Sequence, residues 1–298
     1  MKLIDKWSGS MIRPYLLVVL LSILSVPVSG QENSGLSLRE LSSGGEPRSF
    51  LLYLPDSYSG ESIPLVFSFH GSGGIPQNQV TTTGFDTLAD QHGFAVVFPT
   101  GAFTNSVTAR SWNANIDAGV DDVQFVRDMI EDVAESVNID RSRIYTSGFS
   151  GGARMSSRLA CELSDVLAAA APVAGLQYPD GCTPSRAIPI ISFHAMDDGV
   201  NQYEVGENSR PYWRMGVETA LDKWRQAIDC ALANNDEDIA PGITMYAWNN
   251  CGDTAEIHFF VTETGGHTWP GSSSGSAVQD IDASALIWEF FRRHRLEE

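Results

Sequence analysis

Ser150 lies at the centre of residues 148–152, which follow the pattern Gly-x-Ser-x-Gly. A short apolar stretch, residues 144–146, precedes the pattern, and a stretch compatible with a helix follows it. Small residues on both sides let a strand and a helix meet at a sharp turn, which exposes the serine hydroxyl beside the free N–H groups of the helix. The pattern therefore predicts a nucleophile with part of an oxyanion hole. The alternative is an ordinary glycine- and serine-rich turn.

A serine hydroxyl needs a base to remove its proton, and the base needs an acid that orients it. His267 lies in the glycine-rich segment 264–271, after the last predicted strand, where a loop can reach back over a sheet. We therefore expect His267 to be the base. The other histidines fall at strand ends, within a strand or on helices, and we expect structural roles for them: His70, His92, His194, His258 and His294.

Two adjacent carboxylates, Asp197 and Asp198, follow a predicted strand over residues 188–194 and are the candidates for the acid. Adjacent side chains cannot both point at one imidazole, so only one of them can orient His267. The residues alone leave this choice open, with Glu263 as a third candidate.

An oxyanion hole needs two backbone N–H groups directed at the developing negative charge. One would belong to Gly151, the residue after the nucleophile. The other should come from the loop HGSGG, residues 70–74, where we assign Ser72 and keep Gly73 as the alternative. A phosphate-binding turn is disfavoured because this loop lacks the lysine and the hydroxyl residue of a P-loop.

Composition sets limits on the class of protein and on its partners. The 298 residues are 43% hydrophobic and carry a formal net charge of −18, with an isoelectric point near 4.6. The length suits one sizeable globular domain. An acidic surface repels phosphate backbones, so we expect no nucleic-acid partner, and it fits a neutral substrate better than an anionic one.

The N-terminus has the features of a secretory signal. Basic residues precede an apolar run over residues 15–28, which is short for a membrane span and contains Pro27. Small residues follow, so we predict a signal peptide over residues 1–30, cut near Gly30. Export to the periplasm or the medium follows, with no stable membrane anchor. An uncleaved N-terminal anchor is the alternative.

All four cysteines follow the predicted cleavage site: Cys161, Cys182, Cys230 and Cys251. An even number in an exported chain predicts two disulfides, for which three pairings are possible. None of the spacings is a close Cys-x-x-Cys pair, so zinc is disfavoured. We expect Cys161–Cys182 and Cys230–Cys251, each closing a loop of about twenty residues.

Alternating strands and helices must position these residues. Strand-like, mostly apolar segments lie at residues 48–55, 63–70, 93–99, 143–147, 167–175, 188–194, 244–248 and 256–262. Helical spacing occurs at residues 84–92, 121–137, 217–228 and 281–293 and after Ser150, with Asp121 and Asp122 as helix caps. Residues 31–47 predict an extended lead-in, and residues 100–121 and 265–275 predict long loops. The alternation predicts the α/β class, a mostly parallel sheet with helices on both faces, in one domain over residues 48–298.

Several segments in order resemble one enzyme family: PLVFSFHGSGG, SWNAN with VDDVQF, NIDRSRIYTSGFSGGARMSSRLACE, AAAAPVAG, FHAMDDGVNQY and TGGHTWPG. They are similar to the secreted polyhydroxybutyrate depolymerase and feruloyl esterase-like group of α/β-hydrolases. The resemblance runs from Arg48 to the C-terminal helix and implies an α/β-hydrolase fold. The family's acid segment aligns its aspartate with Asp198, between His194 and Tyr203, which implies the triad Ser150, Asp198 and His267. The resemblance also supports both disulfide pairings.

These inferences together predict a secreted serine esterase that requires no metal or organic cofactor. Its substrates would be esters of polyhydroxyalkanoates or of feruloylated or acetylated polysaccharides. Trp112 and Trp269 are candidates to line the groove for the acyl or polymer chain, with core packing as the alternative. An acyltransferase, a non-catalytic binding module and a serine peptidase are the competing functions.

Overall fold

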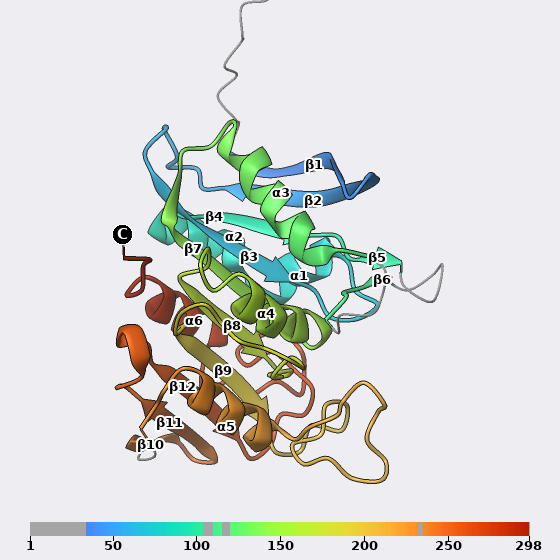
Figure 1. Ribbon diagram of the computed structural model, residues 1–298, viewed down its shortest axis with the longest axis vertical. Helices are drawn as coiled ribbons and strands as arrows, with labels where there is room; N and C mark the ends of the chain where they lie inside the picture. Colours follow the sequence, from blue (N-terminus) through green and yellow to red (C-terminus); the bar gives the residue numbers. More distant parts are fainter. Residues whose placement is uncertain (1–33, 104–109, 115–119, 232–234, 298) are drawn as a thin grey trace, which may run out of the picture. The chain divides into compact units, whose positions relative to one another are not determined.

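The main architectural feature is one long mixed sheet. A computed structural model describes residues 34–103, 110–114, 120–231 and 235–297, so the predicted signal peptide lies outside the described residues. The strands of the sheet are β1 (Gly35–Ser43), β2 (Glu46–Leu54), β3 (Ile63–Phe69), β4 (Ala95–Pro99), β7 (Ile139–Phe149), β8 (Ala169–Val173), β9 (Ile190–Ala195), β10 (Asn235–Ala240), β11 (Ile243–Trp248) and β12 (Ile257–Thr262). Their order is β1-β2-β4-β3-β7-β8-β9-β12-β11-β10 (Figure 1). A separate pair joins β5 (Ala102–Phe103) to β6 (Arg110–Ser111).

The central strands run parallel, and the outer strands on both sides run antiparallel to their neighbours. Strands β4, β3, β7, β8, β9 and β12 form the parallel centre. Strands β1 and β2 extend it on one side and β11 and β10 on the other. Because parallel strands end at the same edge, the residues after β3, β7, β9 and β12 meet at one edge of the sheet. The predicted α/β class is confirmed.

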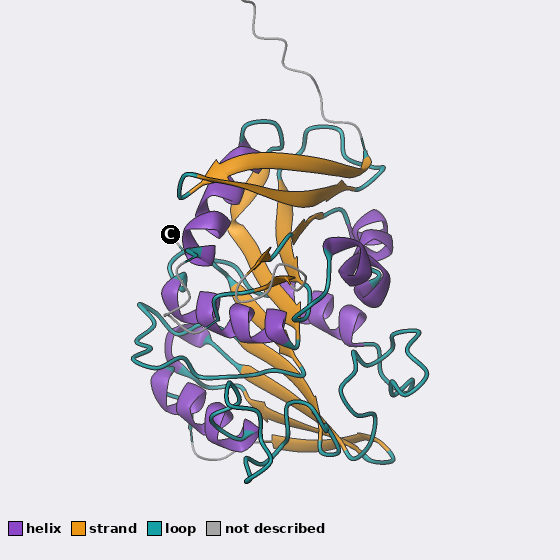
Figure 2. Ribbon diagram, turned by 90° about the vertical axis from the view of Figure 1, so that its right-hand side faces the viewer, coloured by secondary structure: helices purple, strands orange, loops and turns teal. Residues whose placement is uncertain are grey.

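Helices cover both faces of the sheet (Figure 2). The helices are α1 (Pro76–Thr83), α2 (Phe85–His92), α3 (Asp122–Ala134), α4 (Gly151–Glu162), α5 (Val217–Ala227) and α6 (Ala283–Phe291), with a short 3₁₀ turn η1 (Gly252–Thr254). Alternate residues of a strand face opposite sides, so Leu65 and Phe67 pack with α3, α4 and α5, whereas Val66 packs with α2 and α6. Among the described residues, none of these helices has the length and apolar character that a bilayer span requires.

The two aspartates at the start of α3 have different roles. Asp121 caps the helix, because its Oδ1 accepts a hydrogen bond of 2.9 Å from the Gln124 N–H, as predicted. Asp122 is buried, forms an ion pair of 2.7 Å with Arg48 on β2 and accepts a hydrogen bond of 2.7 Å from the Asn113 N–H. It therefore joins β2, α3 and the segment between β6 and α3.

Several peripheral elements differ from the sequence prediction, among them the pair β5–β6, which lies in the predicted loop over residues 100–121. The predicted lead-in, residues 31–47, contains β1, which pairs along its whole length with β2. Strand β10 and helix α1 also lie in segments without a strong apolar pattern. An edge strand or a surface helix buries little apolar surface, so its sequence carries a weak periodic signal.

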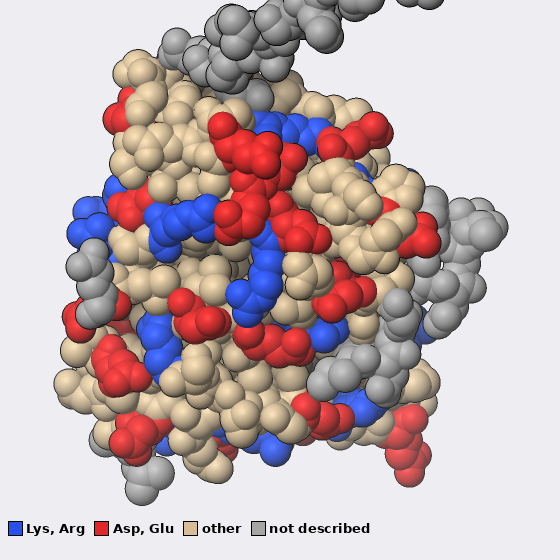
Figure 3. Space-filling model, turned by 45° about the horizontal axis from the view of Figure 1, so that its top comes forward, with Lys and Arg blue, Asp and Glu red and all other residues tan. Residues whose placement is uncertain are grey.

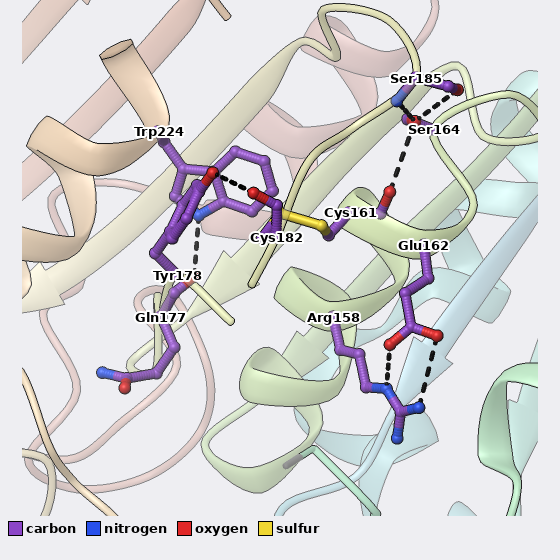
Figure 4. The surroundings of a disulfide bond; sticks show 9 residues. All are labelled: Arg158, Cys161, Glu162, Ser164, Gln177, Tyr178, Cys182, Ser185 and Trp224. Carbon is purple, nitrogen blue, oxygen red and sulfur yellow. Dashed lines mark hydrogen bonds and ion pairs between the residues drawn. A yellow bond between two sulfur atoms is a disulfide. The ribbon is translucent and has the colours of Figure 1, made fainter. Parts of the chain in front are cut away.

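Both predicted disulfide pairings are confirmed. Cys161 in α4 is bonded to Cys182 in the segment after β8, and Cys230 after α5 is bonded to Cys251 before η1. Figure 4 shows hydrogen bonds around Cys182 in the segment after β8, including one of 2.8 Å from the Tyr178 hydroxyl to the Cys182 carbonyl. The disulfide therefore anchors the C-terminal end of α4 to a segment with its own hydrogen bonds.

Replacing Cys161 and Cys182 together by alanine should lower the free energy of unfolding by about 3 kcal/mol, because it opens a cross-linked loop. Urea unfolding would measure the change. The double variant Cys230→Ala/Cys251→Ala is a matched test, because both disulfides span the same separation of 21 residues. An unfolding midpoint unchanged from that of the native protein would contradict the stabilising role.

Candidate active site

Ser150 occupies the turn between β7 and α4 in a conformation that is rare for a residue with a side chain. Its φ is 55° and its ψ is −111°, and its N–H donates a hydrogen bond of 3.0 Å to the Val173 carbonyl. Such backbone strain costs about 1–3 kcal/mol and is found mostly at functional sites. A Cβ added at Gly152 would overlap the Phe69 carbonyl oxygen, so only glycine lets α4 approach the end of β3 this closely. The sharp turn predicted from the Gly-x-Ser-x-Gly pattern is confirmed.

The loop after β3 lies directly beside the start of α4. A Cβ built on Gly151 would lie 2.9 Å from the backbone nitrogen of Ser72. The N–H of Gly73 is already used, since it donates a hydrogen bond of 2.7 Å to the Arg110 carbonyl. The geometry therefore favours Ser72 over Gly73 as the residue whose N–H group accompanies that of Gly151.

His70 holds this loop in place as a buried neutral imidazole. The Gly101 N–H donates to its Nε2 at 3.0 Å, so Nδ1 carries the proton and donates to the Gly71 carbonyl at 2.8 Å. Burial lowers the pKa of His70 to about 4. The structural role predicted for His70 is confirmed, and its effect is to fix the backbone next to Ser72.

His267 and Asp198 come together in the loops after β12 and β9. The Nδ1 of His267 donates a hydrogen bond of 2.7 Å to Oδ2 of Asp198, which is only 3% exposed. The other carboxylate oxygen accepts hydrogen bonds from the N–H groups of Val200, at 2.7 Å, and Asn201, at 2.9 Å. Burial acts to raise the pKa of Asp198, but the His267 contact and these N–H donors outweigh it, so the pKa lies below its usual value.

Asp197 points to a different partner from its neighbour. Its Oδ1 accepts a hydrogen bond of 2.7 Å from the Gly266 N–H, so it holds the histidine loop by its backbone. The Glu263 side chain lies beside Gly242. Of the three acid candidates, Asp198 is therefore the one whose hydrogen bond to the His267 ring the structure records.

The histidine loop returns to the nucleophile turn. The rings of His267 and Phe149, the residue before Ser150, lie 4.9 Å apart between centroids. With Nδ1 bonded to Asp198, Nε2 is the remaining nitrogen of the His267 ring. Within the described residues, no three histidine, cysteine or carboxylate side chains are grouped as a metal site would require.

A second buried histidine connects the loop of Asp198 to β8, the strand beside β7. The Nε2 of His194 donates to the Asn201 carbonyl at 2.8 Å, and burial lowers the pKa of His194. The side-chain nitrogen of Asn201 donates to the Ala174 carbonyl at 2.7 Å, directly after β8. Sequence reasoning assigned His194 a structural role but missed Asn201. No local pattern marks an asparagine whose role is a hydrogen bond to a residue distant in the sequence.

Of the two interpretations of Trp112 and Trp269, the structure supports core packing over the lining of a substrate groove. Their side chains are 5% and 1% exposed, respectively. The Trp112 indole donates to the His70 carbonyl at 2.7 Å, and the Trp269 indole donates to the Ser284 hydroxyl at 3.0 Å. Both are packing residues, because their faces are covered and their N–H groups are satisfied inside the protein.

Comparisons with known proteins assign the family. A model of the family described as Esterase PHB depolymerase matches residues 48–238 of the 298. This chain belongs to that family. It is 29% identical over 251 residues to the bifunctional acetylxylan esterase/xylanase XynS20E of Neocallimastix patriciarum, covering 83% of this chain and 33% of that protein. It is also 29% identical over 231 residues to feruloyl esterase B of Piromyces equi, covering 74% of this chain and 42% of that protein.

A solved structure supports the fold assignment. Acetyl xylan esterase from Aspergillus awamori superposes with a TM-score of 0.62 at 16% identity, covering 86% of this chain and 99% of that one. The family member described here has the α/β-hydrolase fold that the resemblance implied. It spans less than half of the length of the two curated relatives named above.

The buried neutral His70 predicts a loss of stability in acid. Its pKa in the folded state, about 4, lies below the value of about 6.5 expected for an unfolded chain. The unfolded state therefore binds the proton first, and stability present above pH 6.5 is lost as the pH falls towards 4, by about 3 kcal/mol. Buried His194, whose pKa is also lowered, acts in the same direction.

Urea unfolding of His70→Asn and of the native protein, at pH 7 and pH 4.5, measures this contribution. The variant should be less stable at pH 7 but should lose less of its stability between the two pH values. Equal losses in the two proteins would show that the pKa of His70 is the same in the folded and unfolded states.

Proposed function

We propose that this protein is a serine carboxylic ester hydrolase with Ser150 as its nucleophile. The observation that carries the proposal is the 2.7 Å hydrogen bond between His267 and Asp198, in a loop packed against the residue before Ser150. A serine on a strained turn, an imidazole and a buried carboxylate are the groups that acyl transfer requires. Membership of the esterase family supports the same reaction.

In the proposed reaction, the Ser150 oxygen attacks the ester carbonyl and His267 accepts the hydroxyl proton on Nε2. The imidazolium then gives that proton to the departing alcohol, leaving the acyl group on Ser150. A water molecule, deprotonated by the same nitrogen, attacks the acyl carbon. The bond from this carbon to the Ser150 oxygen breaks, the imidazolium returns its proton to that oxygen, and the acid is released. The N–H groups of Ser72 and Gly151 would stabilise the oxyanion in both steps, and one such donor contributes a factor of about 10²–10³ in rate.

The environment of Asp198 suits its proposed part. Because its pKa lies below the usual value, it is ionised at neutral pH and can stabilise the imidazolium. Its hydrogen bond also fixes the tautomer in which Nε2 of His267 is free to accept a proton. The reaction in this form needs no metal or organic cofactor.

For the substrate, we propose an ester of a polymer, either a polysaccharide or a polyhydroxyalkanoate, met outside the cell. The two relatives carry the names acetylxylan esterase and feruloyl esterase, and the family is described by polyhydroxybutyrate depolymerase. Both disulfides fit an oxidising compartment, which supports export by the N-terminal signal over residues 1–30.

Ser150→Ala tests the proposed reaction. The variant should keep its melting temperature within a few degrees and lose hydrolysis of p-nitrophenyl butyrate, because no other group supplies the nucleophile. Ser42→Ala, at an exposed position on the edge strand β1, is the control and should retain full activity. Esterase activity that persists in Ser150→Ala would refute the proposal.

The two adjacent aspartates predict different kinetic effects. Asp198→Asn should lower kcat by a factor of about 10³–10⁴, because an amide favours the wrong imidazole tautomer. Asp197→Asn should lower it less than tenfold, since an amide oxygen can still accept the hydrogen bond from Gly266. Steady-state kinetics on one p-nitrophenyl ester measures kcat for the two variants. An equal loss of kcat in both would contradict the assignment of Asp198 as the acid.

A further inference from the structure

Arg154 places a positive charge beside the proposed oxyanion site. Its N–H donates to the Ser150 carbonyl at 3.1 Å, so it lies one helical turn after the nucleophile. Its guanidinium donates to the Ser72 hydroxyl at 3.3 Å. The carbon of the guanidinium lies 4.2 Å from the centre of the Tyr212 ring, which is 36% exposed. The cation is thus held between the loop after β3 and an aromatic ring at the surface.

This arginine differs from most other arginines of the chain. Ion pairs with carboxylates engage Arg39, Arg48, Arg127, Arg141, Arg143, Arg158, Arg214, Arg225, Arg292, Arg293 and Arg295. On the face drawn in Figure 3, lysine and arginine side chains likewise lie beside acidic ones. In the part of the chain that the structure describes, no carboxylate pairs with Arg154. This is unexpected in a chain with 37 acidic residues and 19 lysines and arginines.

The partners of Arg154 leave its charge uncompensated. A guanidinium has five N–H donors and stays protonated at neutral pH, whereas its partners here, the Ser72 hydroxyl and the Tyr212 side chain, are neutral. The Tyr212 ring attracts the cation and restrains its position without neutralising it. A partly buried cation in this state attracts an anion of matching geometry, and a carboxylate can accept two parallel N–H bonds from it.

We propose that Arg154, restrained by Tyr212, is a specificity-determining residue that binds a carboxylate of the substrate. The proposal rests on the proposed esterase function and narrows its substrate class to esters with an anionic group near the scissile carbonyl. The carboxylate has two chemical sources. It is carried by the alcohol part in an oligomer of a hydroxy acid, and by the acyl part in a half-ester of a dicarboxylic acid.

The local charge reverses what the composition of the chain predicts. A net charge of −18 favours a neutral substrate over an anionic one. Salt screens charges beyond about 8 Å at physiological ionic strength, so a cation in contact with the substrate outweighs distant surface carboxylates. The preference for an anionic substrate should therefore arise at short range and depend on Arg154 itself.

Two matched pairs of esters test the proposal. One pair is the linear 3-hydroxybutyrate dimer with a free carboxylate and its methyl ester, and the other is p-nitrophenyl hydrogen glutarate and p-nitrophenyl valerate. For each pair we take the ratio of kcat/KM for the anionic ester to that for the neutral one. In the native protein this ratio should exceed 1 in at least one pair, and the pair that shows it identifies the source of the carboxylate.

Arg154→Gln should lower that ratio at least tenfold, mainly through a higher KM for the anionic ester, and Arg154→Lys should lower it less. Arg214→Gln is the matched control, because Arg214 is an exposed arginine already paired with Asp180 at 3.0 Å, and it should leave the ratio unchanged. Added sodium chloride should reduce the ratio in the native protein and have little effect on it in Arg154→Gln.

Two outcomes overturn the proposal. A native ratio at or below 1 in both pairs shows that the site does not select a carboxylate. Equal losses of kcat/KM on the anionic and neutral esters in Arg154→Gln show that Arg154 only positions Ser72. The control is hydrolysis of the neutral esters by the native protein and its absence in Ser150→Ala. If this control holds, the esterase function stands even where the proposal for Arg154 fails.

Discussion

The close approach of α4 to the ends of β7 and β3 is the constraint on which the candidate site depends. Gly152 admits this approach because a side chain there would overlap the Phe69 carbonyl. The same approach accompanies the strained, positive-φ backbone conformation of Ser150 and brings Gly151 against Ser72. A single steric fact thus positions the nucleophile, both candidate oxyanion donors and, one turn later, Arg154. The packed core on both faces of the sheet offsets the cost of the backbone strain at Ser150.

Polar side chains, two of them buried, bond the backbone of the loops at this edge. His70 anchors the loop after β3, Asp197 anchors the histidine loop, and Asn201 ties the acid loop to the residue after β8. The bonds of His70 and Asn201 satisfy backbone groups that burial would otherwise leave unpaired, whereas Asp197 lies at an exposed position. Burial lowers the pKa of His70, so it stays neutral and keeps one tautomer. His267 differs, because its Nδ1 faces an ionised carboxylate and its ring remains partly exposed.

The charges of the molecule act at two length scales. Over the whole chain the acidic excess governs solubility and long-range repulsion. At the site, interactions at contact distance dominate, and Arg154 meets an aromatic ring and a hydroxyl, whereas most other described arginines meet carboxylates. Composition therefore describes the surface on average, whereas recognition depends on which charges remain uncompensated at short range.

The sequence by itself determined the features that local patterns encode. Buried apolar runs predicted the parallel strands, glycine spacing predicted the turn at Ser150, and the cysteine spacing led to the pairings that the structure has. Tertiary structure decided which groups meet. It brought Asp198 to His267 and Asp197 to Gly266, contacts between residues 69 positions apart. It also buried Trp112 and Trp269, the two candidates for substrate binding. The edge strands β1 and β10 also escaped prediction. The reason is that periodicity and backbone sterics are properties of residues close together in the sequence. Contacts and burial depend on which distant strands lie side by side in the sheet.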